Sequence, residues 1–243
     1  MPEKPENDNG RPGLLQFLVE PARAALEAGS VALKKPQLTG PDTGNPGIVI
    51  VIPGFTTNDS ATIVLRKMLD SAGYDVNCWN QGFNLGIRKK LFDGLVDEFD
   101  RLHAHHNCKI GIVGQSLGGI YARELAKLRP LQSNHVITLG TPINHSEGSE
   151  SRVAGLYKLL NLHQLRSGQI EHAFDHWNIA EAPPVPTTAI YSITDGICHW
   201  RTCIQHGDHP HVENLEVPGS HLGMGLNGDI LTAISQRLSA LKP

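Results

Sequence analysis

Ser116, with a glycine two residues before it and another two residues after it, is the residue whose surroundings most clearly predict chemistry. Residues 114–118 read GQSLG, after an apolar stretch at 109–113 and before a helical pattern at 117–128. A strand, a tight turn and a helix in this order lift the hydroxyl of Ser116 above the carboxyl edge of a sheet, where it can act as a nucleophile. The five letters are a weak motif by themselves, because the chain contains 25 glycines. The alternative is a glycine-rich turn without chemical purpose.

Two backbone N–H groups near Ser116 are candidates for binding a negative charge that develops on a substrate. The N–H of Leu117 opens the predicted helix, where unpaired N–H groups and the positive end of the helix dipole coincide. The second candidate follows the first clear strand, 47–52, in a Pro-Gly-Phe turn. We choose the N–H of Phe55, because the proline lacks one and the glycine lets the loop approach closely. An ordinary turn is the alternative for this segment.

A serine needs a neighbouring base to take its proton, and the chain offers 13 histidines. His221 comes shortly after the strand-like segment 212–217, and Asp195 comes shortly after the strand-like segment 188–193. Both residues are therefore expected at the same sheet edge as Ser116, in the chain order nucleophile, acid, base. The carboxylate would orient the imidazole, and the imidazole would relay the proton.

Other acids and histidines have less suitable positions. Asp175 and Asp208 follow no clear strand, His135 begins a strand, and His199 belongs to a loop that we expect to lead away from the edge. Residues 205–211 contain metal-binding side-chain types without a fixed ligand spacing. We therefore expect no metal and no other cofactor.

The elements that must position these groups alternate in type along the chain. Short apolar runs follow helical patterns, which predicts an α/β protein with a mostly parallel central sheet and helices on both faces. We expect strands at 47–52, 74–79, 109–113, 136–139, 188–193 and 212–217, and helices at 60–72, 87–102, 117–128 and 229–241.

Three segments fall outside this alternation. Residues 1–13 are polar and proline-rich and are predicted to be a disordered lead to a single domain, 14–243. Apolar residues at helical spacing in 14–26 predict a helix packed on the body of the protein, which Pro21 should kink or split. A membrane-surface anchor is the alternative, although the segment is not strongly basic. Residues 144–186 are expected to form a small cap insertion, either a lid over an acyl pocket or a cover for the sheet edge.

Composition excludes several classes of protein. The net charge of −3 gives no footprint for nucleic acid, and no apolar run approaches the ~20 residues that span a bilayer. The first residues lack the pattern of a signal peptide. The four cysteines form no CxxC motif. We therefore expect a cytoplasmic protein with reduced thiols, in which a Cys198–Cys203 bridge is disfavoured. The sequence leaves the oligomeric state open.

Six stretches keep a characteristic order along the chain: VIPGFTTNDS, WNQGFNLG, GIVGQSLGGIYARELAK, VITLGTPI, YSITDGI and VPGSHLGMG. With these stretches the chain resembles the α/β-hydrolase superfamily, and within it a bacterial lipase/esterase-like branch. The resemblance implies the α/β-hydrolase fold, a catalytic triad of Ser116, Asp195 and His221, and oxyanion donors at Phe55 and Leu117. Many lipases and esterases carry His-Gly in the oxyanion loop, where this chain has Pro-Gly. The Pro-Gly pair still leaves the backbone N–H of Phe55 as a donor to the oxyanion. It weakens the assignment of the chain to a particular subfamily.

The resemblance implies hydrolysis of small-molecule carboxylic esters through an acyl-enzyme on Ser116. The apolar residues of the 144–186 insertion favour an acyl chain of medium length. Acyl transfer to an alcohol or thiol by the same triad is one alternative. A non-catalytic binding protein on a hydrolase scaffold is another, against which the intact triad argues.

Overall fold

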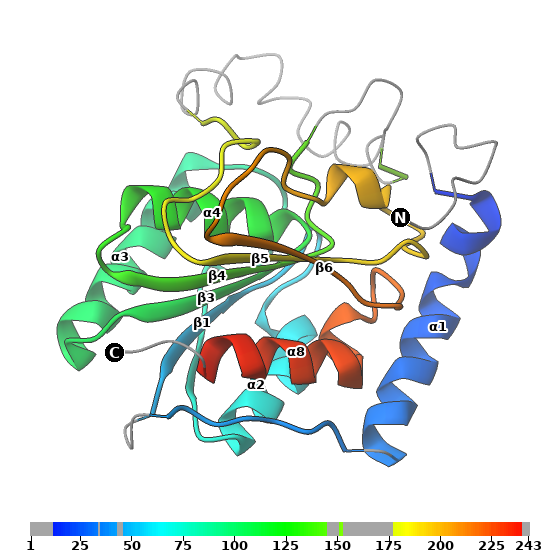
Figure 1. Cartoon of the computed structure of the whole chain (residues 1–243), viewed down its shortest axis with the longest axis horizontal. Helices are drawn as coiled ribbons and strands as arrows, with labels where there is room; N and C mark the ends of the chain where they lie inside the picture. Colours follow the sequence, from blue (N-terminus) through cyan, green and yellow to red (C-terminus); the bar gives the residue numbers. More distant parts are fainter. Residues whose placement is uncertain (1–11, 34, 43–45, 145–150, 153–176, 240–243) are drawn as a thin grey trace.

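Six parallel strands form one sheet in the computed structural model of the chain (Figure 1), in the order β2-β1-β3-β4-β5-β6. The predicted α/β class and mostly parallel sheet are confirmed. The strands are β1 (Ile48–Ile52), β2 (Asp75–Cys78), β3 (Ile110–Gln115), β4 (Ser133–Leu139), β5 (Thr187–Tyr191) and β6 (Val212–Glu216). The structure describes residues 12–33, 35–42, 46–144, 151–152 and 177–239.

Helices cover both faces of this sheet (Figure 1). α3 (Lys89–His106) and α4 (Leu117–Leu128) lie on one face, and α2 (Ile63–Ser71) and α8 (Gly228–Ser239) lie on the other. All five residues of β1 are buried as a result, so its sequence is continuously apolar rather than alternating. Its even-numbered isoleucines pack toward α3 and α4, and its two valines pack toward α2 and α8. The short 3-10 helices are η1 (Asp59–Thr62), η2 (Trp200–Thr202) and η3 (Met224–Leu226).

The register of the strands brings their carboxyl ends to one edge. Gln115 at the end of β3 pairs with Leu139 of β4, and Tyr191 at the end of β5 pairs with Glu216 of β6. The connections that follow β3, β5 and β6 therefore begin at the same edge of the sheet. This is the edge at which open α/β sheets place their ligand sites.

The first helix differs from the prediction. α1 (Leu14–Leu33) is one continuous helix with Pro21 inside it, neither split nor ended there. Proline removes one hydrogen bond and crowds the carbonyl four residues earlier. Side chains on both sides of the proline, Glu20 and Arg23, bond to the body of the protein and hold the two halves in line.

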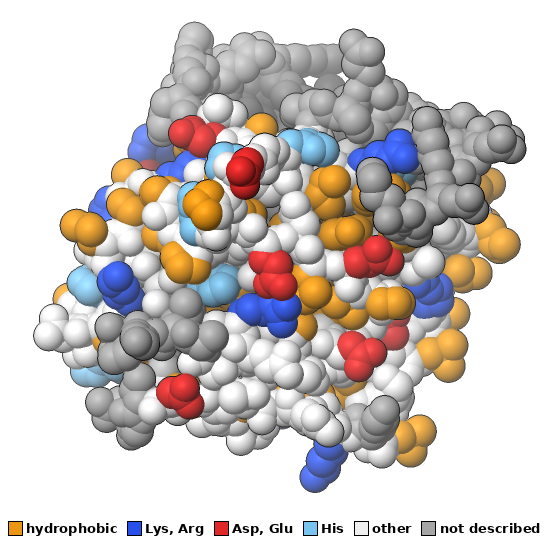
Figure 2. All heavy atoms as spheres, in the orientation of Figure 1, with side chains coloured by type: hydrophobic (Ala, Val, Ile, Leu, Met, Phe, Trp, Pro, Cys, Tyr) orange, Lys and Arg blue, Asp and Glu red, His pale blue; other side chains and the backbone are white. Residues whose placement is uncertain are grey.

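The polarity of α1 is inverted with respect to a typical surface helix. Its leucines were expected to pack on the body, but the leucines of its outer face expose between 64 and 92% of their surface: Leu15, Leu18, Leu26 and Leu33. Figure 2 shows hydrophobic side chains protruding at the right-hand margin, where Figure 1 places α1. The helix contacts the body through its opposite face, which carries its charged residues. The apolar pattern thus predicted the helix but not the face that packs.

Two expectations fall largely outside the described residues. They concern the disordered lead at 1–13 and the cap insertion at 144–186, of which the structure describes 12–13, 144, 151–152 and 177–186. Within the described ranges, no helix combines the length and the apolar character needed to cross a bilayer.

Candidate active site

Ser116 occupies a strained turn between β3 and α4. Its backbone has φ 51° and ψ −122°, a conformation that costs a non-glycine residue of order 1–3 kcal/mol. Its N–H donates to Leu139 O at 2.8 Å, which ties the turn to the neighbouring strand. Glycines make the turn fit: a Cβ on Gly118 would come within 2.6 Å of Pro53 O, and a Cβ on Gly114 would collide with the backbone of Gly118.

The loop after β1 lies directly against this turn. A Cβ added to Gly54 would be 3.4 Å from Gln115 O and from Ser116 Cβ, so the loop approaches the serine at van der Waals distance. Phe55 follows this contact, and Leu117 follows Ser116 at the first position of α4. The two backbone groups that the sequence suggested as oxyanion donors therefore belong to the two segments that meet at the serine.

Asn84 holds the loop after β1 in place. This fully buried side chain donates from Nδ2 to Pro53 O at 2.9 Å. Its backbone accepts from Thr56 N at 2.7 Å and donates to Thr57 O at 2.8 Å. Thr56 has φ 62°, so three hydrogen bonds fix a loop that contains a left-handed residue.

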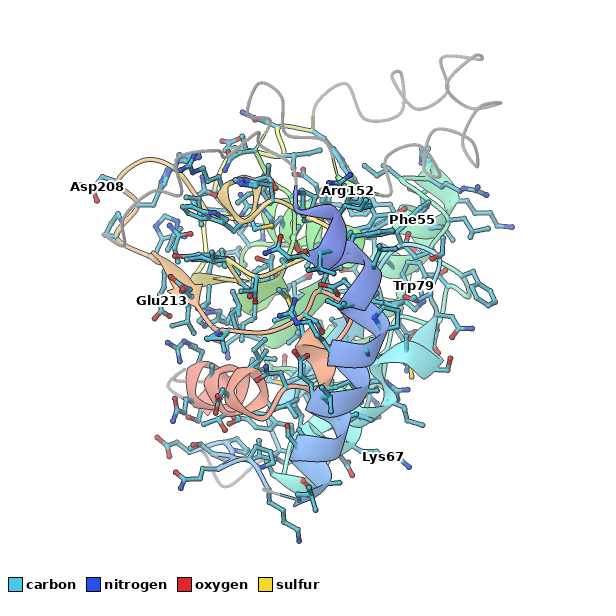
Figure 3. The ribbon with its side chains drawn as sticks, turned by 90° about the vertical axis from the view of Figure 1, so that its right-hand side faces the viewer. Phe55, Lys67, Trp79, Arg152, Asp208 and Glu213 are labelled. Atoms are coloured by element: carbon cyan, nitrogen blue, oxygen red, sulfur yellow. The ribbon has the colours of Figure 1, made fainter. Side chains whose placement is uncertain are left out.

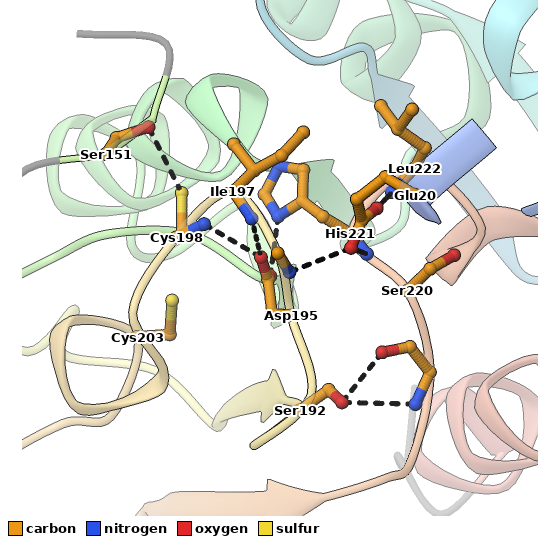
Figure 4. Close-up of polar contacts among 12 residues, drawn as sticks. Glu20, Ser151, Ser192, Asp195, Ile197, Cys198, Cys203, Ser220, His221 and Leu222 are labelled. Carbon is orange, nitrogen blue, oxygen red and sulfur yellow. Dashed lines mark hydrogen bonds and ion pairs between the residues drawn. The ribbon is translucent and has the colours of Figure 1, made fainter. Parts of the chain in front are cut away.

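Asp195 and His221 form a buried pair. His221 Nδ1 lies 2.6 Å from Asp195 Oδ2, and the two residues are 4% and 3% exposed. The other oxygen of Asp195 accepts from the backbone N–H groups of Ile197 and Cys198, both at 2.8 Å (Figure 4). The carboxylate is thereby fixed in orientation and directs the second imidazole nitrogen away from itself.

Contacts on either side of Ser116 connect it to this pair. Gln115, the preceding residue, donates from Nε2 to His221 O at 3.1 Å. Leu139, which accepts the N–H of Ser116, is followed by Gly140, where an added Cβ would be 3.0 Å from His221 Nδ1. The imidazole therefore lies against the strand end that holds the serine turn.

The charged neighbours of His221 raise its pKa. Burial alone would lower this pKa, but the Asp195 carboxylate at hydrogen-bond distance outweighs burial and stabilises the imidazolium, and Glu20 acts in the same direction. Cys198 carries little charge near neutral pH, because a hydrogen bond to Cys203 and burial raise its pKa well above the ordinary thiol value. The site thus favours a histidine that holds a proton strongly.

Side chains from α1 hold the loops that carry Asp195 and His221, and sequence reasoning missed them. Glu20, Arg23 and Glu27 all make hydrogen bonds to these loops. One pattern in the sequence could have found them: they are the only charged residues of the helix, and their spacing of three and four residues puts them on one face.

The competing candidates have other positions. His135 Nε2 lies 2.9 Å from Thr188 Oγ1 inside the sheet, and burial lowers its pKa to about 4. Asp208 lies in an exposed loop, labelled in Figure 3, and Asp175 is outside the described residues. Within the part of the chain that the structure describes, no group of three or more His, Cys, Asp or Glu side chains could hold a metal ion.

Known proteins share this fold at low sequence identity. No family model matches the chain, and no curated protein matches it. Among solved structures, it is similar to a Paleococcus ferrophilus monoacylglycerol lipase, with a TM-score of 0.57 and 17% identity over 84% of this chain and 96% of that one. An Aspergillus fumigatus lipase B gives a TM-score of 0.64 and 19% identity over 86% of this chain. The chain spans 56% of that lipase.

A third similar structure is an α/β-hydrolase enzyme from the metagenome of lagoon sediments in Morocco. It matches with a TM-score of 0.54 and 13% identity, over 82% of this chain and 91% of that one. At identities this low, the structural similarity establishes the shared fold alone. The chemistry must be argued from the residues at the sheet edge.

Proposed function

From the α/β-hydrolase fold of this chain and the side chains gathered at its sheet edge, we propose that the protein is a serine hydrolase of carboxylic esters. The observation that carries the proposal is the buried pair of His221 and Asp195, 2.6 Å apart, beside the strained turn of Ser116. A histidine oriented by a carboxylate next to a serine on a tight strand-to-helix turn is the arrangement that activates a hydroxyl for acyl transfer.

The first step forms an acyl-enzyme. Ser116 Oγ attacks the ester carbonyl carbon while the Nε2 atom of His221 takes the hydroxyl proton. Asp195 keeps Nδ1–H pointed at itself and stabilises the imidazolium. The carbonyl oxygen becomes an oxyanion, which the N–H groups of Phe55 and Leu117 bind. Loss of one such donor typically costs about 2.7–4 kcal/mol of transition-state stabilisation.

The second half of the reaction returns the serine. The tetrahedral intermediate collapses, the bond to the leaving oxygen breaks, and His221 gives its proton to the departing alcohol. Water then attacks the acyl group on Ser116, with His221 again taking a proton. Collapse of the second intermediate releases the carboxylic acid and restores the hydroxyl. Every proton in this scheme moves through His221, so the chemistry requires no cofactor.

We further propose a small-molecule ester with an acyl chain as the substrate. Two solved proteins with this fold are named lipases, one of them a monoacylglycerol lipase. Leu222, next to His221, leaves 44% of its surface exposed, and the aromatic ring of Phe55 is half-buried. These side chains offer apolar surface beside the reacting groups.

Covalent labelling tests the proposal. A fluorophosphonate probe should label the folded protein once, on Ser116, and the substitution Ser116→Ala should abolish both the label and ester hydrolysis, lowering kcat by roughly 10⁴-fold or more. Assays on p-nitrophenyl esters of rising chain length would show the acyl preference. Added alcohol would reveal acyl transfer through a new ester product. Folded wild-type protein that takes no label would instead be a binding protein on this scaffold.

A further inference from the structure

The inward face of α1 carries a row of three charged side chains. Glu20, Arg23 and Glu27 are the only charged residues among the twenty of the helix, and all three face the body of the protein. Figure 3, viewed from the side of α1, shows this helix crossing the front of the molecule. The inward face of this helix therefore joins the body through hydrogen bonds of its charged side chains as well as through buried apolar side chains such as Ala24 and Val31.

Glu20 bonds to both loops of the buried acid–base pair. Its carboxylate is 1% exposed and accepts three backbone N–H groups. Oε1 accepts from Gly196 at 2.8 Å and from His221 itself at 3.1 Å, and Oε2 accepts from Leu222 at 2.9 Å (Figure 4). One carboxylate thus connects the residue after Asp195 to the histidine that Asp195 orients.

Arg23 and Glu27 bond to the same loops on either side of Glu20. Arg23 donates to Thr194 O at 2.6 Å and to Thr194 Oγ1 at 2.8 Å. Glu27 accepts from Ser220 N at 2.7 Å and Ser220 Oγ at 3.0 Å, and burial raises its pKa. Residues directly before Asp195 and directly before His221 are therefore held by the same helix.

We propose that Glu20 is a positioning residue of the active site, which fixes the loops of Asp195 and His221 relative to each other. The proposal rests on the proposed esterase function and assigns to α1 a part in catalysis. The side-chain bond between Asp195 and His221 sets one distance only. The backbone hydrogen bonds to Glu20 fix the positions of the two loops relative to each other. They thereby fix the position of the His221 imidazole relative to Ser116.

The charge of Glu20 adds an electrostatic effect. The ionisable groups that face His221 are Asp195 and Cys198 from the loop after β5 and Glu20 from α1. The thiol is neutral near pH 7, so two carboxylates remain, and both favour the imidazolium that forms when Ser116 gives up its proton. Removing the charge of Glu20 should lower the pKa of His221, whereas moving the charge slightly should not.

The decisive variants are Glu20→Gln and Glu20→Asp. Gln keeps the shape, but it loses the charge and one acceptor oxygen. We expect kcat to fall by roughly 10- to 100-fold with KM nearly unchanged, and the acid limb of the pH profile to move to lower pH. Asp keeps the charge but shortens the reach, so kcat should fall while the acid limb stays in place. Should the Gln variant not fold, the Asp variant tests positioning alone.

Glu213→Gln is the matched control. Glu213 lies on β6 and accepts two hydrogen bonds from the Arg237 guanidinium and one from Thr188 Oγ1, residues outside the loops of Asp195 and His221. Its substitution should leave kcat and the pH profile unchanged. Rates are expressed per labelled serine, so that a smaller folded fraction does not count as slower catalysis. Unchanged kcat and pH profile per labelled site in both Glu20 variants would overturn the proposal.

A readout that needs no substrate separates this proposal from the esterase itself. The Nδ1 proton of His221, in its short bond to Asp195, should give a far-downfield NMR resonance that shifts in Glu20→Gln and not in Glu213→Gln. A wild-type protein that takes no fluorophosphonate label would refute the esterase function. The same resonance, unmoved by either Glu20 variant, would refute the role of Glu20.

Discussion

The two halves of the candidate site are built in different ways. The turn of Ser116 is local: a strand, five residues and a helix, with glycines that allow backbones to touch. The loops of Asp195 and His221 are held by side chains of α1, whose hydrogen bonds span between 171 and 202 residues of sequence. The turn of Ser116 depends on glycines, which have no side chain. The loops of Asp195 and His221 depend on particular charged side chains of α1.

This difference determines how each half should fail. A methyl group in the serine turn meets main-chain atoms that cannot move without breaking the sheet, so the expected damage is abrupt. A changed partner in the acid–base half alters hydrogen bonds and charge while the backbone remains largely in place. Its damage should be graded and should depend on pH. Three experiments test this contrast, beginning with the largest effect.

Gly118→Ala should break the serine turn. The added Cβ would come within 2.6 Å of Pro53 O and closer still to Ile52 O, both main-chain atoms. We expect the free energy of unfolding to fall by about 3 kcal/mol or more and hydrolysis to be lost, measured by chemical denaturation and ester assay. Gly29→Ala is the control, because nothing lies within 4 Å of its Cβ in α1. It should stabilise the helix by about 0.5–1 kcal/mol.

Asp195→Asn should disable the acid–base half without unfolding it. The amide has nearly the shape of the carboxylate, but it cannot stabilise the imidazolium or hold the proton on Nδ1 of His221. We expect kcat to fall by roughly 10⁴-fold and the melting temperature to change little. Asp208→Asn, in an exposed loop, should leave kcat at the wild-type value. A variant of Asp195 with near-normal kcat would remove that residue from the triad.

The pH dependence of kcat/KM should report the acid–base half alone. Neutral imidazole is the base, so activity is lost as pH falls through the pKa of His221. Asp195 raises that pKa above its ordinary value of 6.5 despite burial, and the acid limb should therefore lie on the alkaline side of 6.5. A profile measured with a neutral ester would show this limb. A limb centred below pH 6.5 would contradict the assigned base.

The sequence was sufficient for most of the local structure. The turn of Ser116 could be predicted because its glycines, strand and helix are contiguous. Asp195 and His221 were found at the expected edge because each follows the end of a strand in a parallel sheet. The predicted strands and helices agree with the observed elements to within a few residues, except for the helix α1.

The long-range contacts could not be predicted in this way. Pattern analysis assumes that the apolar face of a helix is the face that packs, and α1 violates this assumption. The partners of Glu20 are backbone N–H groups, which leave no mark on the side-chain pattern. Asn84 was similarly hidden, because its role depends on where two loops meet in space.

The connection between the two ends of the chain also bears on synthesis. Glu20 leaves the ribosome long before Gly196, His221 and Leu222, which follow it by 176 to 202 residues. At about 5–20 residues per second, the carboxylate waits roughly 10–40 s for its partners. During that interval the helix has no docking site, and Glu20 lacks the backbone N–H groups that it binds in the folded protein. The first helix therefore stays undocked, and open to chaperones and proteases, until the segment with residues 196–222 has been made.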